Sequence, residues 1–413
     1  MSDVKDGERA TLLKEEIISR IDMSRDVSDD EIRDIIRDTI YGMKQRDNIS
    51  LAEREELFQL LFFEVRRLGI LEELVADSSV TEIMVNGTDD IFIERNGMIS
   101  KWDKRFDSEE KLRSVIQQIV AKSNRVVNEA SPIVDARLEN GARVNVVMNP
   151  VAINGPILTI RRFPDDPISM KDLIGFSSIT PEAAEYLKRL VISGYNIFVS
   201  GGTGSGKTTF LNALSEFIPS TERLVTIEDS AELQIRGIDN LVSLETRNAN
   251  VEGLKEISIR DLIKTSLRMR PDRIIVGEIR DGAALDFLSA ANTGHDGSLC
   301  TGHANSAKDM LSRIETMVLM GMDLPLPAIR RQMASAIDII VHLGRLRDKS
   351  RKVLEITEMI GLNNGEFVLN PLFSFAEEGE TKRGLIKGNL KKTGKLSFTE
   401  KLQRCGLYDK GLV

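Results

Sequence analysis

The residues with the clearest chemical meaning lie between Gly201 and Thr209. They fit the pattern G-x-x-x-x-G-K-[ST], in the order Gly201, Gly202, Thr203, Gly204, Ser205, Gly206, Lys207 and Thr208, followed by Thr209. Glycines in such a loop allow backbone N–H groups to converge on phosphate oxygens, and the helix that follows adds partial positive charge. We expect Lys207 to reach the β- and γ-phosphates of a nucleoside triphosphate and the Thr208 hydroxyl to bind Mg²⁺.

The segments on either side of this loop support the same interpretation. The apolar run NIFVSG before it predicts a strand, and the pattern of residues 208–217 after it predicts a helix. A strand, a glycine-rich loop and a helix in this order distinguish a phosphate-binding loop from a chance glycine-rich turn.

Acidic residues follow two further apolar runs that predict strands. LVTIE ends at Glu228, and RIIVGE ends at Glu278. Ligands of an open α/β sheet lie beyond the carboxyl ends of its strands, so we expect both side chains near the phosphate loop. Hydrolysis of a nucleotide needs a carboxylate for Mg²⁺ or its waters and a group that orients the attacking water. Glu278 is predicted to hold Mg²⁺, directly or through water, and the general base is either Glu278 or Glu228.

The chain has only three histidines, and two of them stand in the segment TGHDGSLCTGHANS. An imidazole N–H can donate a hydrogen bond to a phosphate oxygen. We therefore expect His303, at the end of a predicted strand, to sense the γ-phosphate, with His295 as a second candidate. His342, in DIIVHLG, is expected to be structural.

Composition limits the class of protein. Of 413 residues, 41% are hydrophobic and 29% charged, which is typical of a soluble chain with two or three domains. The net charge of −8 argues against direct nucleic-acid binding, for which basic domains are usual. Two cysteines exclude a disulfide scaffold and indicate a reducing compartment. Because no apolar run suits a membrane span or a signal peptide, we expect a cytoplasmic location.

The patterns change along the chain in a way that predicts four parts. Residues 1–68 carry amphipathic helical patterns and predict a helical bundle. Residues 69–163 combine short strands ending in Asn-Gly with one helix at 108–122, which predicts an α+β, PAS-like domain. Residues 164–176 have the composition of a linker. Residues 177–413 alternate apolar strands with helices, which predicts an α/β domain around a parallel sheet.

The two ends of the chain carry opposite charge. Residues 1–60 hold 16 acidic and 10 basic side chains, whereas residues 381–413 hold 9 basic and 2 acidic ones. Runs of charge are usually solvated, so we expect an acidic helical region and a loosely held basic tail. The alternative is that the two ends bind different partners.

Four segments occur in the order found in the traffic ATPases of the secretion superfamily. The phosphate loop, TIEDSAEL, RIIVGEIRD and TGHDGSLCTGHANS resemble the Walker A, Asp box, Walker B and His box of that superfamily. ARLENGARVNVVMNP and ILTIRRFP resemble its tight-adherence (CpaF/TadA) pilus branch and the related conjugative ATPases. The resemblance covers about residues 60–345. It implies a homo-hexamer with a RecA-like C-terminal domain that hydrolyses ATP to power pilus assembly or secretion.

The resemblance also implies further site residues and a partner. Members of the superfamily place arginines of the N-terminal domain against the phosphates, and Arg137, Arg143 and Arg162 stand in matching segments, with Arg161 as an open alternative. Arginine suits this role because its planar fork stays charged and binds phosphate through two hydrogen bonds. The implied partner is an inner-membrane platform protein, which would hold the chain at the inner face of the cell membrane.

Two features depart from the pattern of the superfamily. The four-cysteine zinc module of some relatives is absent, because Cys300 and Cys405 are the only cysteines. Gly302 precedes His303 where relatives usually carry a large apolar residue. The expectation for the strand that carries His303 is therefore a less rigid segment.

Two other functions would also use a phosphate loop. A RecA-like nucleic-acid translocase needs a basic stripe or stacking aromatics, whereas this chain is acidic and only 5% aromatic. A nucleotide switch without turnover would have no need of Glu278 and His303. The sequence therefore favours an ATP-hydrolysing enzyme.

Overall fold

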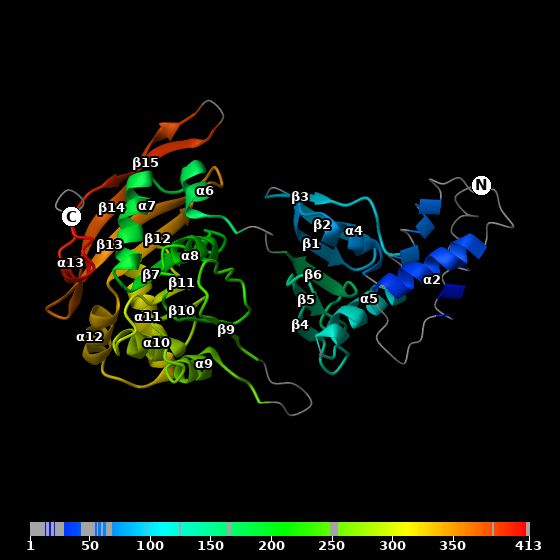
Figure 1. The fold of residues 1–413 in the computed structure, drawn as a ribbon, viewed down its shortest axis with the longest axis horizontal. Helices are drawn as coiled ribbons and strands as arrows, with labels where there is room; N and C mark the ends of the chain where they lie inside the picture. Colours follow the sequence, from blue (N-terminus) through cyan, green and yellow to red (C-terminus); the bar gives the residue numbers. More distant parts are fainter. Residues whose placement is uncertain are drawn as a thin grey trace. The chain divides into compact units, whose positions relative to one another are not determined.

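The computed structural model describes residues 68–409 except 96, 124, 163–166, 248–254 and 382–383, together with helix α2 (Asp29–Gly42) and single positions between 13 and 62. The chain forms two compact units, residues 1–165 and residues 166–413 (Figure 1). Within the described part of the chain, no helix is long and apolar enough to cross a lipid bilayer.

Helix α2 belongs to a small apolar cluster in the N-terminal unit. Three isoleucines of α2 at helical spacing are buried against residues before and after the helix; the cluster comprises Leu13, Ile17, Ile32, Ile36, Ile40, Leu61 and Phe62. Helix α2 agrees with the helical pattern predicted within residues 1–68. Most of the rest of that segment lies outside the described residues.

A six-stranded antiparallel sheet forms the larger part of this unit, in the order β3-β2-β1-β6-β5-β4. The strands are β1 (Val80–Asn86), β2 (Asp90–Arg95), β3 (Met98–Lys101), β4 (Ile133–Arg137), β5 (Arg143–Val147) and β6 (Ile157–Arg161). The predicted hairpins are confirmed, since Gly87 and Gly97 adopt positive φ between paired strands. A 3-10 turn, η2 (Gly69–Leu71), and helix α4 (Glu72–Ala76) precede the sheet, and helix α5 (Glu109–Lys122) shares its core.

The C-terminal unit is built on a nine-stranded sheet in the order β15-β14-β13-β12-β7-β11-β10-β8-β9. The strands are β7 (Ile197–Gly201), β8 (Leu224–Glu228), β9 (Leu241–Glu245), β10 (Arg273–Val276), β11 (Leu299–His303), β12 (Ile339–Arg345), β13 (Arg351–Asn363), β14 (Glu366–Glu380) and β15 (Ile386–Lys392). From β12 to β9 neighbouring strands are parallel, which confirms the α/β prediction, whereas β13 to β15 extend the sheet antiparallel.

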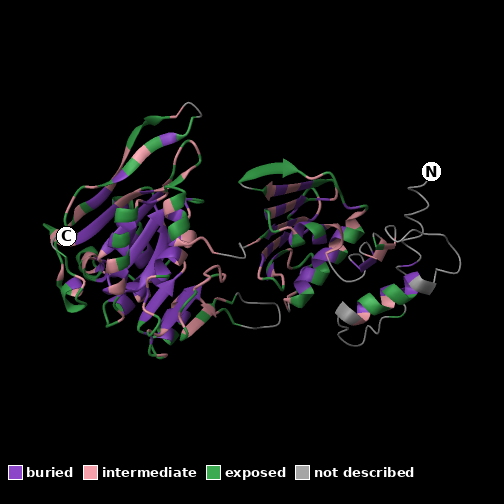
Figure 2. Ribbon diagram, turned by 45° about the horizontal axis from the view of Figure 1, so that its top comes forward, coloured by how far each residue is buried: buried purple, intermediate pink, exposed green. Residues whose placement is uncertain are grey.

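Helices cover both faces of the parallel part of this sheet. They are α6 (Met170–Gly175), α7 (Pro181–Ile192), α8 (Lys207–Ser215), α9 (Ile259–Ser266), α10 (Ala283–Ala291), α11 (Ala307–Gly321) and α12 (Leu326–Ala336). Alternate strand residues point to opposite faces. Ile197 and Val199 pack with α6 to α8, whereas Phe198 packs with α9 to α12. The central strands are therefore buried on both sides (Figure 2). Helix α6 lies within residues 164–176, whose composition predicts a linker.

The basic C-terminal region is part of the fold, so the expectation of a loosely held tail is wrong. β15 pairs with β14, and helix α13 (Glu400–Arg404) follows it. The buried Glu358 carboxylate of β13 accepts the backbone N–H groups of Ser397 and Phe398 at 2.8–2.9 Å. The lysines of this region looked solvated in the sequence, but the Glu358 carboxylate binds the backbone N–H groups of Ser397 and Phe398 among them.

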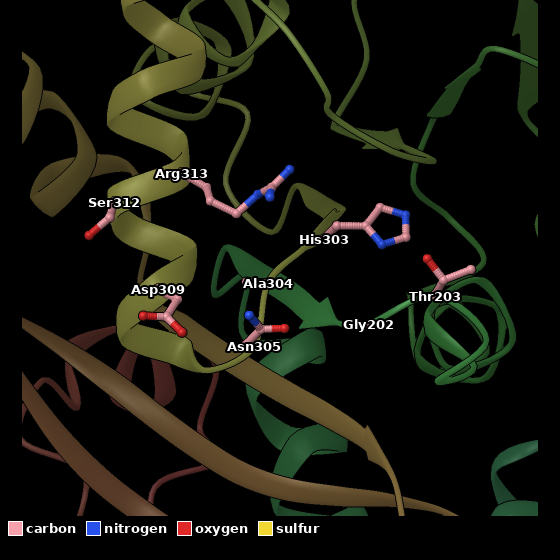
Figure 3. A pocket seen from close by; sticks show the side chains of 8 residues that line it. All are labelled: Gly202, Thr203, His303, Ala304, Asn305, Asp309, Ser312 and Arg313. Atoms are coloured by element: carbon pink, nitrogen blue, oxygen red, sulfur yellow. The ribbon is translucent and has the colours of Figure 1, made fainter. Parts of the chain in front are cut away.

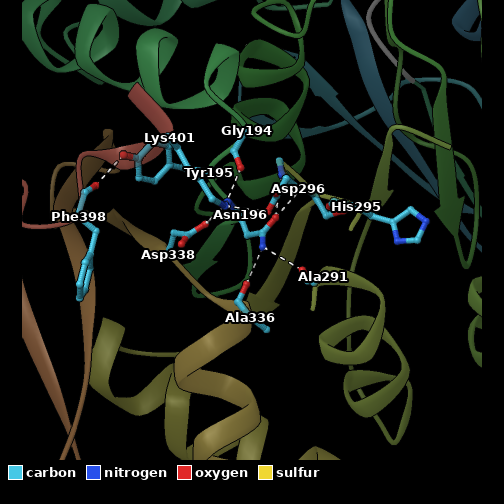
Figure 4. Close-up of polar contacts among 12 residues, drawn as sticks. Gly194, Tyr195, Asn196, Ala291, His295, Asp296, Ala336, Asp338, Phe398 and Lys401 are labelled. Atoms are coloured by element: carbon cyan, nitrogen blue, oxygen red, sulfur yellow. Dashed lines mark hydrogen bonds and ion pairs between the residues drawn. The ribbon is translucent and has the colours of Figure 1, made fainter. Parts of the chain in front are cut away.

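Lys401 fixes α13 to the end of the sheet opposite the phosphate loop (Figure 4). Its ammonium group donates to the Gly194 carbonyl and to the carboxylates of Asp296 and Asp338, each at 2.9 Å. Burial raises the pKa of Asp338, and Lys401 opposes that shift. Removal of the ammonium group would leave a largely buried carboxyl without its cation.

We predict that Lys401→Ala lowers the free energy of unfolding by about 2 kcal/mol, the scale of a lost hydrogen bond to a charged group. Urea unfolding followed by circular dichroism measures it. Lys395→Ala, which removes an exposed lysine of the same region, is the matched control and should change little. Equal stability of the two variants would show that Lys401 does not hold α13.

Candidate functional site

The phosphate loop joins β7 to α8 as predicted. β7 is buried along its length and ends at Gly201, and α8 begins at Lys207. Gly204 and Gly206 have φ of 71° and 92°, which L-residues with a Cβ rarely adopt. A Cβ on Gly201 would lie 2.6 Å from the Leu343 carbonyl oxygen, so this position also requires glycine. The loop geometry therefore depends on the glycines that define the motif.

Lys207, His303 and Glu278 lie next to one another beyond the ends of three parallel strands. Lys207 Nζ is 3.3 Å from His303 Nδ1 and donates to the Gly202 carbonyl at 3.1 Å. His303 Nε2 is 2.8 Å from Glu278 Oε1. The expected convergence of the phosphate loop with Glu278 and His303 is present in the fold.

The contacts of His303 define its protonation. An ammonium group only donates hydrogen bonds, so Nδ1 must accept and the imidazole proton must sit on Nε2, toward Glu278. Burial lowers the pKa of His303. The charge of Glu278 raises this pKa, whereas the charges of Lys207 and Arg280 lower it further. Burial also lowers the pKa of Lys207, although Glu278 opposes the shift. A neutral imidazole thus separates a cation from an anion.

Arg280 holds the other oxygen of Glu278. Its Nη2 donates to Glu278 Oε2 at 2.8 Å, and its Nη1 lies 3.6 Å from Asp229. Burial favours the protonated form of Glu278, but Arg280, with His303 and Lys207, outweighs it and lowers the pKa of this carboxyl. Glu278 is therefore ionised at neutral pH. The segment RIIVGEIRD contains Arg280, but its spacing alone does not predict the ion pair between Arg280 and Glu278.

A cavity of about 460 Å³ opens beside His303 (Figure 3). It is lined by Gly202 and Thr203 of the phosphate loop, by His303 at the end of β11 with Ala304 and Asn305 after it, and by Asp309, Ser312 and Arg313 of α11. The cavity thus lies beside the first residues of the phosphate loop, on the side of His303.

Glu228, the competing candidate for general base, has a structural contact. Its side chain is buried, and Oε1 accepts the N–H groups of Glu232 and Leu233 at 2.9 and 3.0 Å. A Cβ on Gly277 would lie 2.9 Å from Glu228 Cγ, so the neighbouring strand packs tightly against it. Glu278, not Glu228, is the carboxylate that contacts His303.

The other two histidines lie away from this cluster. His295, labelled in Figure 4, precedes β11 at the opposite end of that strand from the phosphate loop. Its Nδ1 lies 3.1 Å from the Ala290 carbonyl. The expectation that His295 faces the phosphates is therefore wrong. His342 is buried, with Nδ1 2.9 Å from the Ser200 hydroxyl, in agreement with a structural role.

Gly302 is explained by the packing behind the strand that carries His303. A Cβ at this position would lie 2.7 Å from Met310 Cε and 3.0 Å from Phe198 Cε1. The volume of a larger residue is taken by these two side chains, and β11 stays paired with β7 up to His303. The expectation of a less rigid strand finds no support in this packing.

Thr208 and Glu278 are the residues predicted to hold Mg²⁺. Thr208 stands in the first turn of α8, where its loop position suits a metal next to the phosphates. Glu278 Oε1 is buried and receives no aligned hydrogen bond from the described residues, so it can still serve a cation or its water. The described residues contain no cluster of three or more metal-binding side chains.

Three arginines of the N-terminal unit stand in one row across neighbouring strands. Arg137 lies opposite Arg143, and Arg143 lies opposite Arg161. Directly opposed residues share a face of the sheet, and opposed like charges are destabilising. Arg162 is not in the row: its guanidinium donates to the Asp77 carbonyl and its N–H to Thr81. The register thus puts Arg161, and not Arg162, in one row with Arg137 and Arg143.

The sequence matches one family of known proteins over most of its length. The family of type II/IV secretion system proteins matches residues 64–385. The conjugal transfer protein TrbB of Rhizobium radiobacter is 34% identical over 296 residues, 70% of this chain and 87% of TrbB. The type IV secretion system protein PtlH of Bordetella pertussis is 32% identical over 325 residues, 71% of this chain and 95% of PtlH.

A solved structure supports the fold. The pilus retraction motor PilT, solved with bound ADP, matches with a TM-score of 0.52 and 20% identity, and the match covers 82% of this chain and 86% of PilT. At this identity the likeness concerns the fold alone.

Proposed function

The chain belongs to the type II/IV secretion system protein family, and on this premise we propose that it is a motor that hydrolyses ATP to ADP and phosphate. The observation that carries the proposal is the contact of Lys207, His303 and Glu278 at the end of a phosphate loop. A binding protein without turnover would gain nothing from a partly buried, ionised carboxylate beside the expected position of the γ-phosphate.

The residues of the site divide the chemistry among them. The backbone N–H groups of residues 201–209 bind the phosphates, and Lys207 moves from His303 to the phosphate oxygens when nucleotide enters. Bound Mg²⁺ would neutralise phosphate charge, held by Thr208 and, directly or through water, by Glu278. Glu278 accepts a proton from the attacking water, and the Nε2–H of His303 turns toward the γ-phosphate.

The arginine row would complete the site from the N-terminal unit. Arg137, Arg143 and Arg161 lie opposite one another across β4, β5 and β6, with Glu82 of β1 opposite Arg161, and the planar guanidinium fork suits phosphate oxygens. We propose that this row meets the phosphates during turnover, in the same subunit or in a neighbouring one. Arg162, occupied by the Asp77 carbonyl, keeps the end of β6 in place.

The finer assignment follows from the resemblance. We propose a homo-hexameric ring of the tight-adherence type that drives pilus assembly or secretion through an inner-membrane platform protein. The acidic α2 region is the proposed platform contact, since it lies outside the family match. A position at the inner face of the cell membrane belongs to the same proposal.

We predict that Glu278→Gln lowers kcat for ATP by about 10²- to 10⁴-fold, the usual contribution of a general base, while ADP affinity stays near that of the wild type. Lys207→Ala should weaken binding of both nucleotides. Phosphate release and titration of a fluorescent ADP analogue measure the two effects. Full turnover by the Glu278 variant would remove it as the base and return Glu228 to consideration.

We predict that Arg143→Ala and Arg161→Ala each lower kcat by about 10²-fold, as for other donors that stabilise a transition state. Arg162→Ala is the adjacent control and should keep kcat, because its guanidinium is bound to backbone. ATP turnover at saturating nucleotide measures all three. A loss in Arg162→Ala with normal turnover in Arg161→Ala would contradict the role of the row.

A further inference from the structure

The turn between β12 and β13 reaches the outer side of the phosphate loop. β12 runs parallel to β7 with Leu343 opposite Gly201, and it continues to Arg345. Arg345 lies opposite Arg351, the first residue of β13. Because the phosphate loop follows Gly201 directly, the turn extends alongside that loop.

Two arginines of this turn approach the loop. Arg351 Nε donates a hydrogen bond to the Gly204 carbonyl at 2.9 Å, and Arg351 Cδ lies 3.5 Å from the place of a Cβ on Gly206. Arg345 Nη1 is 4.0 Å from the place of a Cβ on Gly204. The N–H groups of a phosphate loop turn toward the phosphates, so a carbonyl that binds arginine faces away from them. Arg351 therefore supports the loop from behind.

A third arginine of the turn has a different environment. Arg347 pairs with the carboxylates of Glu377 and Glu380 on β14. Arg345 and Arg351 form no ion pair with any residue that the structure describes. Arg347 is thus a natural control for Arg351, since it has the same chemistry in the same turn but no contact with the loop.

The next two residues of β13 contact the end of α6. Lys352 Nζ donates to the Ser177 carbonyl at 2.6 Å, and the Val353 N–H donates to the Ser178 carbonyl at 2.8 Å. Ser177 has φ of 55°, a left-handed conformation that glycine usually takes at a helix end. A non-glycine residue there is strained, so contacts that fix its carbonyl help to keep α6 terminated at this point.

Helix α6 is also attached at its other end. The Met170 N–H donates to the Glu216 carboxylate at 3.3 Å. Glu216 is the C-cap of α8, the helix that follows the phosphate loop. α6 is the first helix or strand of the C-terminal unit. In the chain, α6 therefore follows the junction with the N-terminal unit, and it contacts α8, the helix after the phosphate loop.

We propose that residues 351–353 of β13 form a strut between the phosphate loop and α6, in which Arg351 is a positioning residue for the loop. The proposal rests on the proposed function, since the loop must bind nucleotide. Nucleotide that fills the loop fixes the Gly204 carbonyl. Arg351 passes that constraint along the strand to Lys352 and Val353, which hold the end of α6. Loading of the site is thereby transmitted toward the junction between the units.

The first test compares ADP affinity, with Mg²⁺ present, among variants of the turn. Arg351→Ala should weaken ADP binding about 10-fold, the effect of a lost hydrogen bond to a charged group. Arg351→Lys keeps the charge but lacks the planar fork, so it should recover only part of the loss. Arg347→Ala should bind as the wild type does. Thermal melting of the same samples separates a loss of affinity from a loss of folding.

The second test follows hydrogen exchange in peptides that span residues 170–180. In the wild type and in Arg347→Ala, saturating ADP should slow exchange in this segment. Arg351→Ala should lose that response even at ADP concentrations that saturate it. Lys352→Ala should bind ADP normally and still lose the response, which a merely structural role for Arg351 would not produce.

The outcomes separate the strut from the proposed function. A wild-type chain that binds no ADP would contradict the proposed function. A wild type that binds ADP, with Arg351→Ala binding equally well, would overturn the role of Arg351. Protection of residues 170–180 that persists in both Arg351→Ala and Lys352→Ala would overturn the strut.

Discussion

Lys207, His303 and Glu278 come from three different parts of the chain, and the parallel order of β7, β11 and β10 brings them together. In that order the phosphate loop, the histidine and the carboxylate all follow the carboxyl ends of adjacent strands. The sheet is buried on both faces by helices, so these ends cannot shift independently. The neutral imidazole between an ammonium group and a carboxylate is the interaction on which the remaining site geometry depends.

The charges of the site are balanced by neighbours rather than by solvent. Glu278 is partly buried yet ionised, because Arg280 binds one oxygen and His303 approaches the other. Among the described residues, the hydrogen-bond partners of the almost wholly buried Lys207 are a carbonyl and an imidazole. In the proposed mechanism phosphate, a stronger acceptor than either of these neutral groups, displaces Lys207 from His303.

Much of this arrangement could be predicted from the sequence, because local patterns carried it. Glycines, Lys207 and a preceding apolar strand predict a phosphate loop. Residues at the carboxyl ends of neighbouring parallel strands are expected to lie close together. Contacts set by register or by distant turns were not predictable. The choice between Arg161 and Arg162 depends on the pairing of β5 with β6. No sequence pattern predicts that Arg351 reaches the loop, and the C-terminal lysines looked solvated although Lys401 is bound.

The central claim is that Arg280 and His303 keep Glu278 ionised as the base for hydrolysis. The most direct measurement is the pH dependence of kcat/KM for ATP in the wild type and in Arg280→Gln, with Arg268→Gln as an exposed control. Loss of Arg280 favours the protonated carboxyl and raises its pKa, so the acidic limb should move to higher pH in Arg280→Gln alone. An acidic limb at the same pH in all three proteins would contradict the account.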